Sequence, residues 1–263
     1  MPVIGLLYPG DSAKDDYEHL EAPLADHGVR LHVEETSVGV DAHEVEALLD
    51  LGSAERLGEA AARIADRVDA LSWACTSGSF VFGPAGARRQ VDGLATRTGL
   101  PASSTSLAFV RSCQALGVTR VAVAASYPQD VAEHFTAFLA DAGIEVVTMS
   151  SHGIHTAAQV GTLQRDDVTE IVAAIVATGG GNDAEAVLVP DTAMHTLAWL
   201  PDMERVAGRP VLTANQVTVF DALGLLGRRP RLEGFGTLFE LPPDGDPVAP
   251  GGAGANARRE RGE

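Results

Sequence analysis

The sequence has little cysteine and little positive charge. Only two cysteines, Cys75 and Cys113, occur in 263 residues, and they lie in different local contexts. They indicate no disulfide framework, so we expect the reducing environment of the cytoplasm. Lysine and arginine number 19 against 36 aspartates and glutamates, which gives a net charge of -17 at pH 7. Nucleic acids and anionic membranes bind clustered basic residues, so neither is an expected partner.

Long hydrophobic runs are also missing. Apolar residues make up 45% of the chain, yet no segment approaches the continuous apolar length of a membrane span. The first residues, Met1-Pro2-Val3, lead into an apolar stretch without a basic region before it, so no secretion signal is expected. A chain of this length can bury a sizeable core, as one large domain or two small ones.

Apolar strands alternate with helical stretches along nearly the whole chain. The pattern predicts strands at residues 3–8, 29–34, 69–74, 119–125, 144–149, 185–190 and 210–213. It predicts helices at residues 16–27, 42–67, 84–98, 104–116, 129–142, 166–178, 194–206 and 214–226. Such alternation is typical of an α/β protein whose parallel sheets are covered by helices on both faces.

Two parts of the chain repeat one another. Residues 3–31 and 121–146 each run from an apolar strand through Tyr-Pro-x-Asp and an amphipathic helix to a glycine and a second strand. A Gly-x-Pro sequence precedes an apolar helix in both parts, at Gly99 and at Gly208. The shared order indicates an ancient duplication. The plainer alternative is that successive strands and helices are separated by similar turn residues without any duplication.

The duplication predicts two pseudo-symmetric lobes, each a parallel sheet flanked by helices. We assign residues 1–112 with 213–228 to the first lobe and residues 113–212 to the second. Residues 229–263 form a C-terminal extension, which its proline- and glycine-rich composition predicts to be disordered from about residue 243. The apolar helix expected over 104–116 can serve either the core or the contact between copies in a homo-oligomer.

Polar side chains follow the predicted strands where a ligand is expected. Ligands of open α/β sheets bind beyond the C-terminal ends of the strands. The loops at those ends are residues 8–14, 75–80, 126–129 and 191–195. If the two lobes are equivalent, Cys75 and Asp191 face each other across a cleft, a nucleophile opposite an acid or base.

Cys75 is the candidate reactive residue. It starts the run Cys75-Thr76-Ser77-Gly78, and because this run leads into a helix, we expect N–H groups and the helix dipole to lower the cysteine's pKa. Thr76 and Ser77 can donate hydrogen bonds to a carboxylate. The alternatives are a buried structural cysteine and ordinary turn and N-cap chemistry for the hydroxyls. Cys113, within an apolar helix, is expected in the core.

Other polar residues near the strand ends are weaker candidates. The hydroxyl of Tyr127 can reach a bound anion, or its ring can be a half-buried aromatic at the rim, and Tyr8 has the same two readings. His195 can act as an acid or base, or face solvent. The eight histidines form no ligand-spaced cluster with cysteines or carboxylates, so no metal is expected.

At these residues the sequence resembles the aspartate/glutamate racemase superfamily, and it looks most like the branch of maleate cis-trans isomerases and arylmalonate decarboxylases. The resemblance covers residues 1–228 and implies the two-lobed fold. It implies that Cys75 is the nucleophile, as in the isomerases, and that Thr76, Ser77 and Tyr127 hold carboxylate oxygens of a small carboxylic acid. It also implies chemistry without an organic cofactor or a metal.

The chain departs from the pattern of this branch at three positions. The superfamily has a second cysteine where this chain has Asp191, and the absence of that thiol speaks against racemisation by two thiols. Thr192 follows Asp191 and is a further candidate for binding a carboxylate through its hydroxyl. The decarboxylases keep that second cysteine and usually have glycine at the Cys75 position. The isomerases have an asparagine in the first loop, where Ser12 is the nearest substitute for binding a carboxylate.

These features favour a cofactor-independent cis-trans isomerase of a maleate-like dicarboxylic acid. The thiolate of Cys75 would add to the double bond, rotation would follow, and elimination would give the trans product. The first alternative is an arylmalonate-type decarboxylase, or a racemase-superfamily member of altered substrate, with Cys75 as proton donor. The second is a non-catalytic protein that binds small acids. An ionised Asp191 would repel a dicarboxylate, so we expect Asp191 to be neutral through burial or to serve a substrate with fewer charges.

Overall fold

The computed structural model describes residues 1–10, 12–179 and 181–242. The disorder predicted from about residue 243 and the first aspartate of the repeated motif, Asp11, lie outside these residues. No helix in the described part of the chain is long and apolar enough to cross a membrane.

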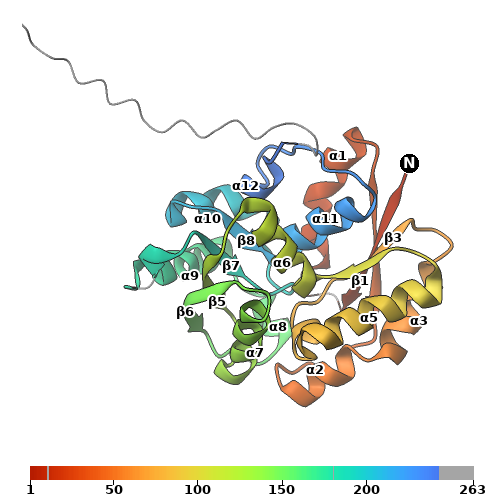
Figure 1. Ribbon diagram of the computed structural model, residues 1–263, viewed down its shortest axis with the longest axis horizontal. Helices are drawn as coiled ribbons and strands as arrows, with labels where there is room; N and C mark the ends of the chain where they lie inside the picture. The colour runs from red at the N-terminus through yellow and green to blue at the C-terminus, as the bar shows by residue number, and fades with distance from the viewer. Residues whose placement is uncertain (11, 180, 243–263) are drawn as a thin grey trace, which may run out of the picture.

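Two four-stranded parallel sheets form the centre of the molecule, one from each half of the chain (Figure 1). The first has the order β2-β1-β3-β4, with β1 (Val3–Pro9), β2 (Arg30–Thr36), β3 (Ala70–Trp73) and β4 (Ala102–Ser104). The second has the order β6-β5-β7-β8, with β5 (Arg120–Ala125), β6 (Glu145–Ser151), β7 (Ala186–Val189) and β8 (Val211–Thr213). The same strand order in both sheets confirms the predicted two-lobed α/β fold.

Helices surround both sheets. Those of the first half are α1 (Glu18–Asp26), α2 (Val45–Leu51), α3 (Ala54–Ile64), α4 (Ser77–Phe80), α5 (Gly83–Thr98) and α6 (Thr105–Leu116). Those that follow are α7 (Gln129–Ala140), α8 (Ala157–Val160), α9 (Arg165–Ala177), α10 (Leu200–Ala207), α11 (Ala214–Leu225) and α12 (Gly236–Phe239). Short 3-10 helices are η1 (Lys14–Tyr17), η2 (Gly181–Asp183) and η3 (Leu197–Trp199).

Three local predictions differ from the structure. The helix predicted at 42–67 is two helices, because α2 ends at Leu51 with Gly52 as its C-cap. The Ser53 hydroxyl then caps α3 by accepting from the Arg56 N–H at 3.5 Å. Strand β4 was not predicted, since its Ala-Ser-Ser sequence lacks strand character and becomes extended only by pairing with β3. The helix predicted at 194–206 begins later, as η3 followed by α10.

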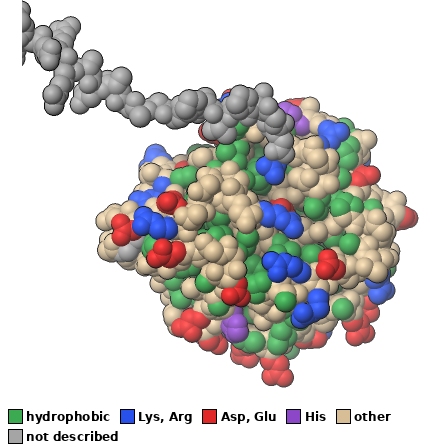
Figure 2. Space-filling model, in the orientation of Figure 1, with side chains coloured by type: hydrophobic (Ala, Val, Ile, Leu, Met, Phe, Trp, Pro, Cys, Tyr) green, Lys and Arg blue, Asp and Glu red, His purple; other side chains and the backbone are tan. Residues whose placement is uncertain are grey.

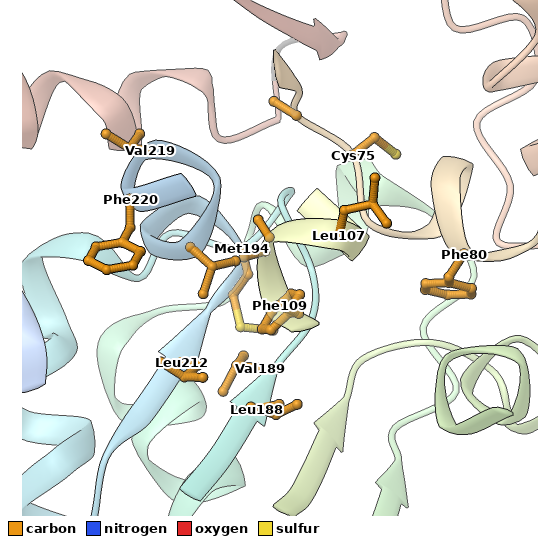
Figure 3. Close-up of a cluster of buried hydrophobic side chains, with 14 of the residues drawn as sticks. Cys75, Phe80, Leu107, Phe109, Leu188, Val189, Met194, Leu212, Val219 and Phe220 are labelled. Atoms are coloured by element: carbon orange, nitrogen blue, oxygen red, sulfur yellow. The ribbon is translucent and has the colours of Figure 1, made fainter. Parts of the chain in front are cut away.

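The two lobes share one hydrophobic core. Figure 3 shows Phe109 of the first half beside Met194 of the second half, and Leu107 next to Cys75. Helix α11, which the sequence assigned to the first lobe, packs against α6, β3 and β4 but also against β8. It is buried on all sides from Ala214 to Leu223. The lobe boundaries at 112/113 and 212/213 therefore remain a proposal, with α11 lying between the sheets.

A buried carboxylate also joins the two halves. Asp16 accepts hydrogen bonds from the backbone N–H groups of Thr196 and Leu197 at 3.0 and 3.1 Å and from Asn215 Nδ2 at 2.8 Å. Burial raises the pKa of Asp16, and these donors oppose the rise. On the outer surface, acidic and basic side chains are interspersed over the face that Figure 2 shows.

Candidate active site

Cys75 and Asp191 occupy equivalent places in the two sheets. Strand β3 ends at Trp73 and β7 ends at Val189, so each residue follows the end of the third strand by the same short step. Both side chains line one cavity of about 260 Å³ between the lobes. The two groups that the sequence placed at equivalent strand ends thus line the same cavity.

The cavity has an apolar wall, and its described lining residues include one histidine, His43, but no lysine or arginine. Its apolar groups come from the loop after β2, from α2 and from α8: Val38, Val40, Leu48, Leu51, Ala157 and Ala158. Its polar groups include two carboxylates, Asp41 and Asp191, besides hydroxyls. A ligand here meets few groups that favour a second negative charge.

Five of the predicted site residues line this cavity: Cys75, Ser77, Asp191, Thr192 and Ser12. Thr76 and Tyr127 do not line it and are buried. The Tyr127 hydroxyl donates to the Pro190 carbonyl. Burial raises the pKa of Tyr127, and the nearby hydroxyls of Thr76 and Ser77 partly offset this rise. The three hydroxyls therefore form a cluster next to Cys75.

The two weaker candidates from the sequence, Tyr8 and His195, lie in different places relative to the cavity. Tyr8 lines the cavity, donates from its hydroxyl to the Thr192 carbonyl at 2.9 Å and accepts the Ala13 N–H at 3.0 Å. It therefore ties the loop after β1 to the loop after β7. His195 lies outside the cavity, where its Nε2 is 2.9 Å from Asp15 Oδ1.

The Cys75 thiol is buried and held in its protonated form. Its Sγ accepts a hydrogen bond from the Gly78 N–H at 3.3 Å and lies 3.8 Å from Ser77 Oγ. Burial nevertheless raises its pKa to about 12, because the loss of solvation outweighs both contacts. The expected lowering was wrong. Helix α4 is only a four-residue turn, and the burial of the loop was not visible in the local sequence.

Asp191 is also shifted toward its neutral form. Burial raises its pKa, while His43, the Ser126 hydroxyl and the Ala193 N–H oppose the rise. Ser126 donates to Asp191 Oδ2, and the Ala193 N–H donates to Oδ1 at 2.9 Å. The direction agrees with the expectation that burial keeps this group neutral beside a negatively charged ligand.

The sequence did not reveal that residues 38–43 close the cavity. We call this segment the strap. His43 Nδ1 lies 2.7 Å from the Ile154 carbonyl, and the His43 ring contacts the Tyr127 ring edge-on at 5.0 Å. Asp41 accepts the N–H groups of Ala157 at 2.8 Å and Ala158 at 3.2 Å. The hydrogen bonds of His43 and Asp41 link residues more than a hundred positions apart, so no local pattern could indicate them.

Known proteins resemble this chain in sequence and in fold. The sequence model of the arylmalonate decarboxylase family matches residues 41–239. The arylmalonate decarboxylase of Bordetella bronchiseptica is 33% identical over 167 residues, which are 63% of this chain and 68% of that protein.

Solved structures agree over most of the chain. A liganded double variant of arylmalonate decarboxylase, with one glycine changed to cysteine and one cysteine to serine, has a TM-score of 0.81 and 25% identity, covering 91% of this chain and 99% of that one. A Nocardia farcinica maleate cis-trans isomerase variant with a covalently bound succinylcysteine intermediate has a TM-score of 0.79 and 23% identity, covering 91% and 98%.

The resemblance found in the sequence is therefore confirmed at the level of the superfamily branch, and these neighbours indicate an enzyme of the decarboxylase and isomerase group. With its family model matched over most of the chain, this protein belongs to the arylmalonate decarboxylase family.

Proposed function

We propose that the protein is a cofactor-independent decarboxylase of a substituted malonate, with Cys75 as the proton donor. The observation that carries the proposal is the buried, protonated Cys75 thiol on a cavity whose described lining has no lysine or arginine side chain. A protonated thiol can give a proton directly, whereas addition to a double bond needs the thiolate. This ranks decarboxylation above the isomerisation that the sequence favoured.

One substrate carboxylate would bind at the hydroxyl cluster of Thr76, Ser77 and Tyr127. Ser77 is the member of this cluster that lines the cavity, and its hydroxyl can donate directly to an anion there. Charge develops on this carboxylate as the reaction proceeds, and fixed donors aimed at developing charge stabilise a transition state.

The second carboxylate would lie against the apolar wall of the strap, α2 and α8. A carboxylate without a partner in apolar surroundings is costly, and its loss as neutral carbon dioxide relieves that cost. The bond between this carboxyl carbon and the α-carbon breaks, and its electron pair forms the enediolate. The Cys75 S–H then gives its proton to the α-carbon. The Gly78 N–H and the Ser77 hydroxyl hold the resulting thiolate until water restores the proton.

The relatives support this assignment of roles. The Bordetella bronchiseptica relative is an arylmalonate decarboxylase. According to the family pattern, decarboxylases usually have glycine at the Cys75 position and a cysteine at the Asp191 position. The decarboxylase double variant gains one cysteine and loses another. Its exchange fits the arrangement of this chain, which has a thiol on one side of the cavity and a carboxyl on the other.

Cis-trans isomerisation of a maleate-like acid is the second candidate. The Nocardia farcinica isomerase forms a covalent adduct on a cysteine, and Cys75 could act in the same way. Two features disfavour it here: the raised pKa of Cys75, and a lining that offers only Ser12 where the isomerases have an asparagine. A non-catalytic acid-binding protein is the third candidate, because a raised thiol pKa is also what a simple binder would have.

Proton NMR of the purified protein with phenylmalonate, and separately with maleate, distinguishes the three. We expect phenylacetate from the wild type, and a rate at least about 100-fold lower in Cys75→Ala, because positioned acids contribute about that much or more. Cys113→Ala is the matched control, since Cys113 is buried in α6 and does not line the cavity. Fumarate formation would establish the isomerase instead, and turnover of neither acid would favour the binder or a different substrate.

A further inference from the structure

Both backbone groups of Gly78, its N–H and its carbonyl, form hydrogen bonds to side chains. Its N–H donates to Cys75 Sγ at 3.3 Å. Its carbonyl accepts from Gln90 Nε2 at 2.8 Å and from Trp73 Nε1 at 3.3 Å. Glycine has no Cβ to restrain its backbone, so these hydrogen bonds decide how Gly78 is oriented.

Gln90, on α5, also reaches a second part of the fold. Its Nε2 donates to the Gly52 carbonyl at 2.7 Å, at the corner between α2 and α3. A Cβ at Gly52 would lie 2.1 Å from the Gly78 carbonyl oxygen, so only glycine permits this close approach. One amide group therefore joins the loop that carries Cys75 to a rigid corner of two helices.

The orientation of the Gln90 amide follows from the two hydrogen bonds that its Nε2 donates. Both of its neighbours at Nε2 are carbonyl oxygens, which only the NH₂ end of the amide can satisfy. Its Oε1 is buried and has no hydrogen-bond partner among the described residues. Leaving a buried acceptor unpaired is unfavourable, which indicates that the two donated hydrogen bonds, and not general packing, account for a glutamine at this place.

We propose that Gln90 is a positioning residue that holds the Gly78 N–H on the Cys75 sulfur and so stabilises the Cys75 thiolate. The role rests on Cys75 as the reacting group of the proposed function. It does not depend on the reaction, because the thiolate occurs both in proton donation and in addition to a double bond. Gln90 does not line the cavity, so it acts on a substrate only through Cys75.

Alkylation of Cys75 in the intact protein tests this without a substrate. Gln90→Met keeps the length of the side chain and removes both donors. We compare its rates with wild type for iodoacetamide and for the larger N-ethylmaleimide at one alkaline pH, by mass spectrometry of the peptide that contains Cys75. Both rates should fall by the same factor, about threefold to tenfold, since the thiolate fraction drops tenfold for each unit that the pKa rises.

The direction separates stabilisation of the thiolate from simple loosening of the loop. Loosening would raise both rates, and the rate of the larger reagent more. Unchanged or higher rates in folded Gln90→Met would overturn the proposal. Gln129→Met is the control, because Gln129 bonds only to Glu133 on the exposed face of α7, at 3.0 Å, among the contacts described, and its rates should equal those of wild type.

A second variant covers the case in which Gln90→Met does not fold. Gln90→Glu preserves the shape and replaces the donors with a carboxylate, and the same fall in both rates is expected. If wild type turns over neither phenylmalonate nor maleate, the proposed function fails, while the alkylation result for Gln90 stands independently.

Discussion

At the scale of single residues, the site combines two acids that burial keeps protonated. The Cys75 thiol and the Asp191 carboxyl line the same cavity, and desolvation is the main cause of the raised pKa of each. Each group has hydrogen bonds that favour its charged form, but these only partly offset burial. A dicarboxylate therefore enters a site that bears less negative charge than its sequence suggests.

The charge of Asp191 should appear in the pH dependence of catalysis. The carboxyl is neutral below its raised pKa and negative above it, so repulsion of a dicarboxylate sets in as the pH rises through that pKa. We expect kcat/KM of the wild type to fall by about tenfold across this step. Asp191→Asn cannot ionise and should lack the step in its pH profile.

The control for that experiment is Asp15→Asn, at the surface beside His195, which should keep the step of the wild type. An Asp191→Asn profile identical to that of the wild type would show that another group titrates.

The sequence was informative about residues at strand ends and not about their surroundings. Cys75 and Asp191 could be paired because the duplication places them at equivalent strand ends. The hydroxyls next to Cys75 could be read directly from the run that follows it. The pKa of Cys75 and the contacts of His43 could not, because both depend on side chains that come close only in the folded chain.

At the scale of elements, the strap over residues 38–43 completes the cavity. It comes from the first half of the chain and binds the segment 154–158 of the second half through Asp41 and His43. The sequence placed His43 in a long helix, yet α2 begins only at Val45. The position of the strap is thus set by hydrogen bonds between the lobes, which a helical pattern cannot anticipate.

Removing the Asp41 carboxylate should release the strap from α8. Asp41→Ala leaves the N–H groups of Ala157 and Ala158 without this acceptor, so their hydrogen exchange should become about fivefold faster or more. Hydrogen-exchange mass spectrometry of peptides over residues 154–160 measures this. Asp130→Ala, at an exposed position of α7, should leave those peptides unchanged. Equal protection in Asp41→Ala and wild type would mean that the strap is held by other contacts.

At the scale of the whole molecule, two similar sheets share one core and a central helix. Helix α11 contacts elements of both sheets and is buried along most of its length. The fold class and the two-lobed plan could be predicted, because alternating apolar strands and helices leave few topologies open. The sharing of α11 could not, since its apolar residues are spread around the helix and do not identify which elements lie on either side.

Asp16 should contribute to the stability of the whole chain. Asp16→Ala leaves the N–H groups of Thr196 and Leu197 and the Asn215 amide without their acceptor, in a place that water does not reach. We expect the free energy of unfolding to fall by about 3 kcal/mol. Urea unfolding followed by circular dichroism measures it. Asp66→Ala, at an exposed site, should change it by less than about 0.5 kcal/mol, and equal losses in both variants would be inconsistent with this role.

The Tyr8 hydroxyl and the Thr192 carbonyl, 184 positions apart, also order events during synthesis. A chain still growing on the ribosome contains Cys75 long before residues 191–193, which complete the cavity around it. Until those residues emerge, the cavity lacks the side formed by Asp191, Thr192 and Ala193. The cavity around the thiol is therefore complete only after most of the chain has been made, and slow translation of the second half delays its completion.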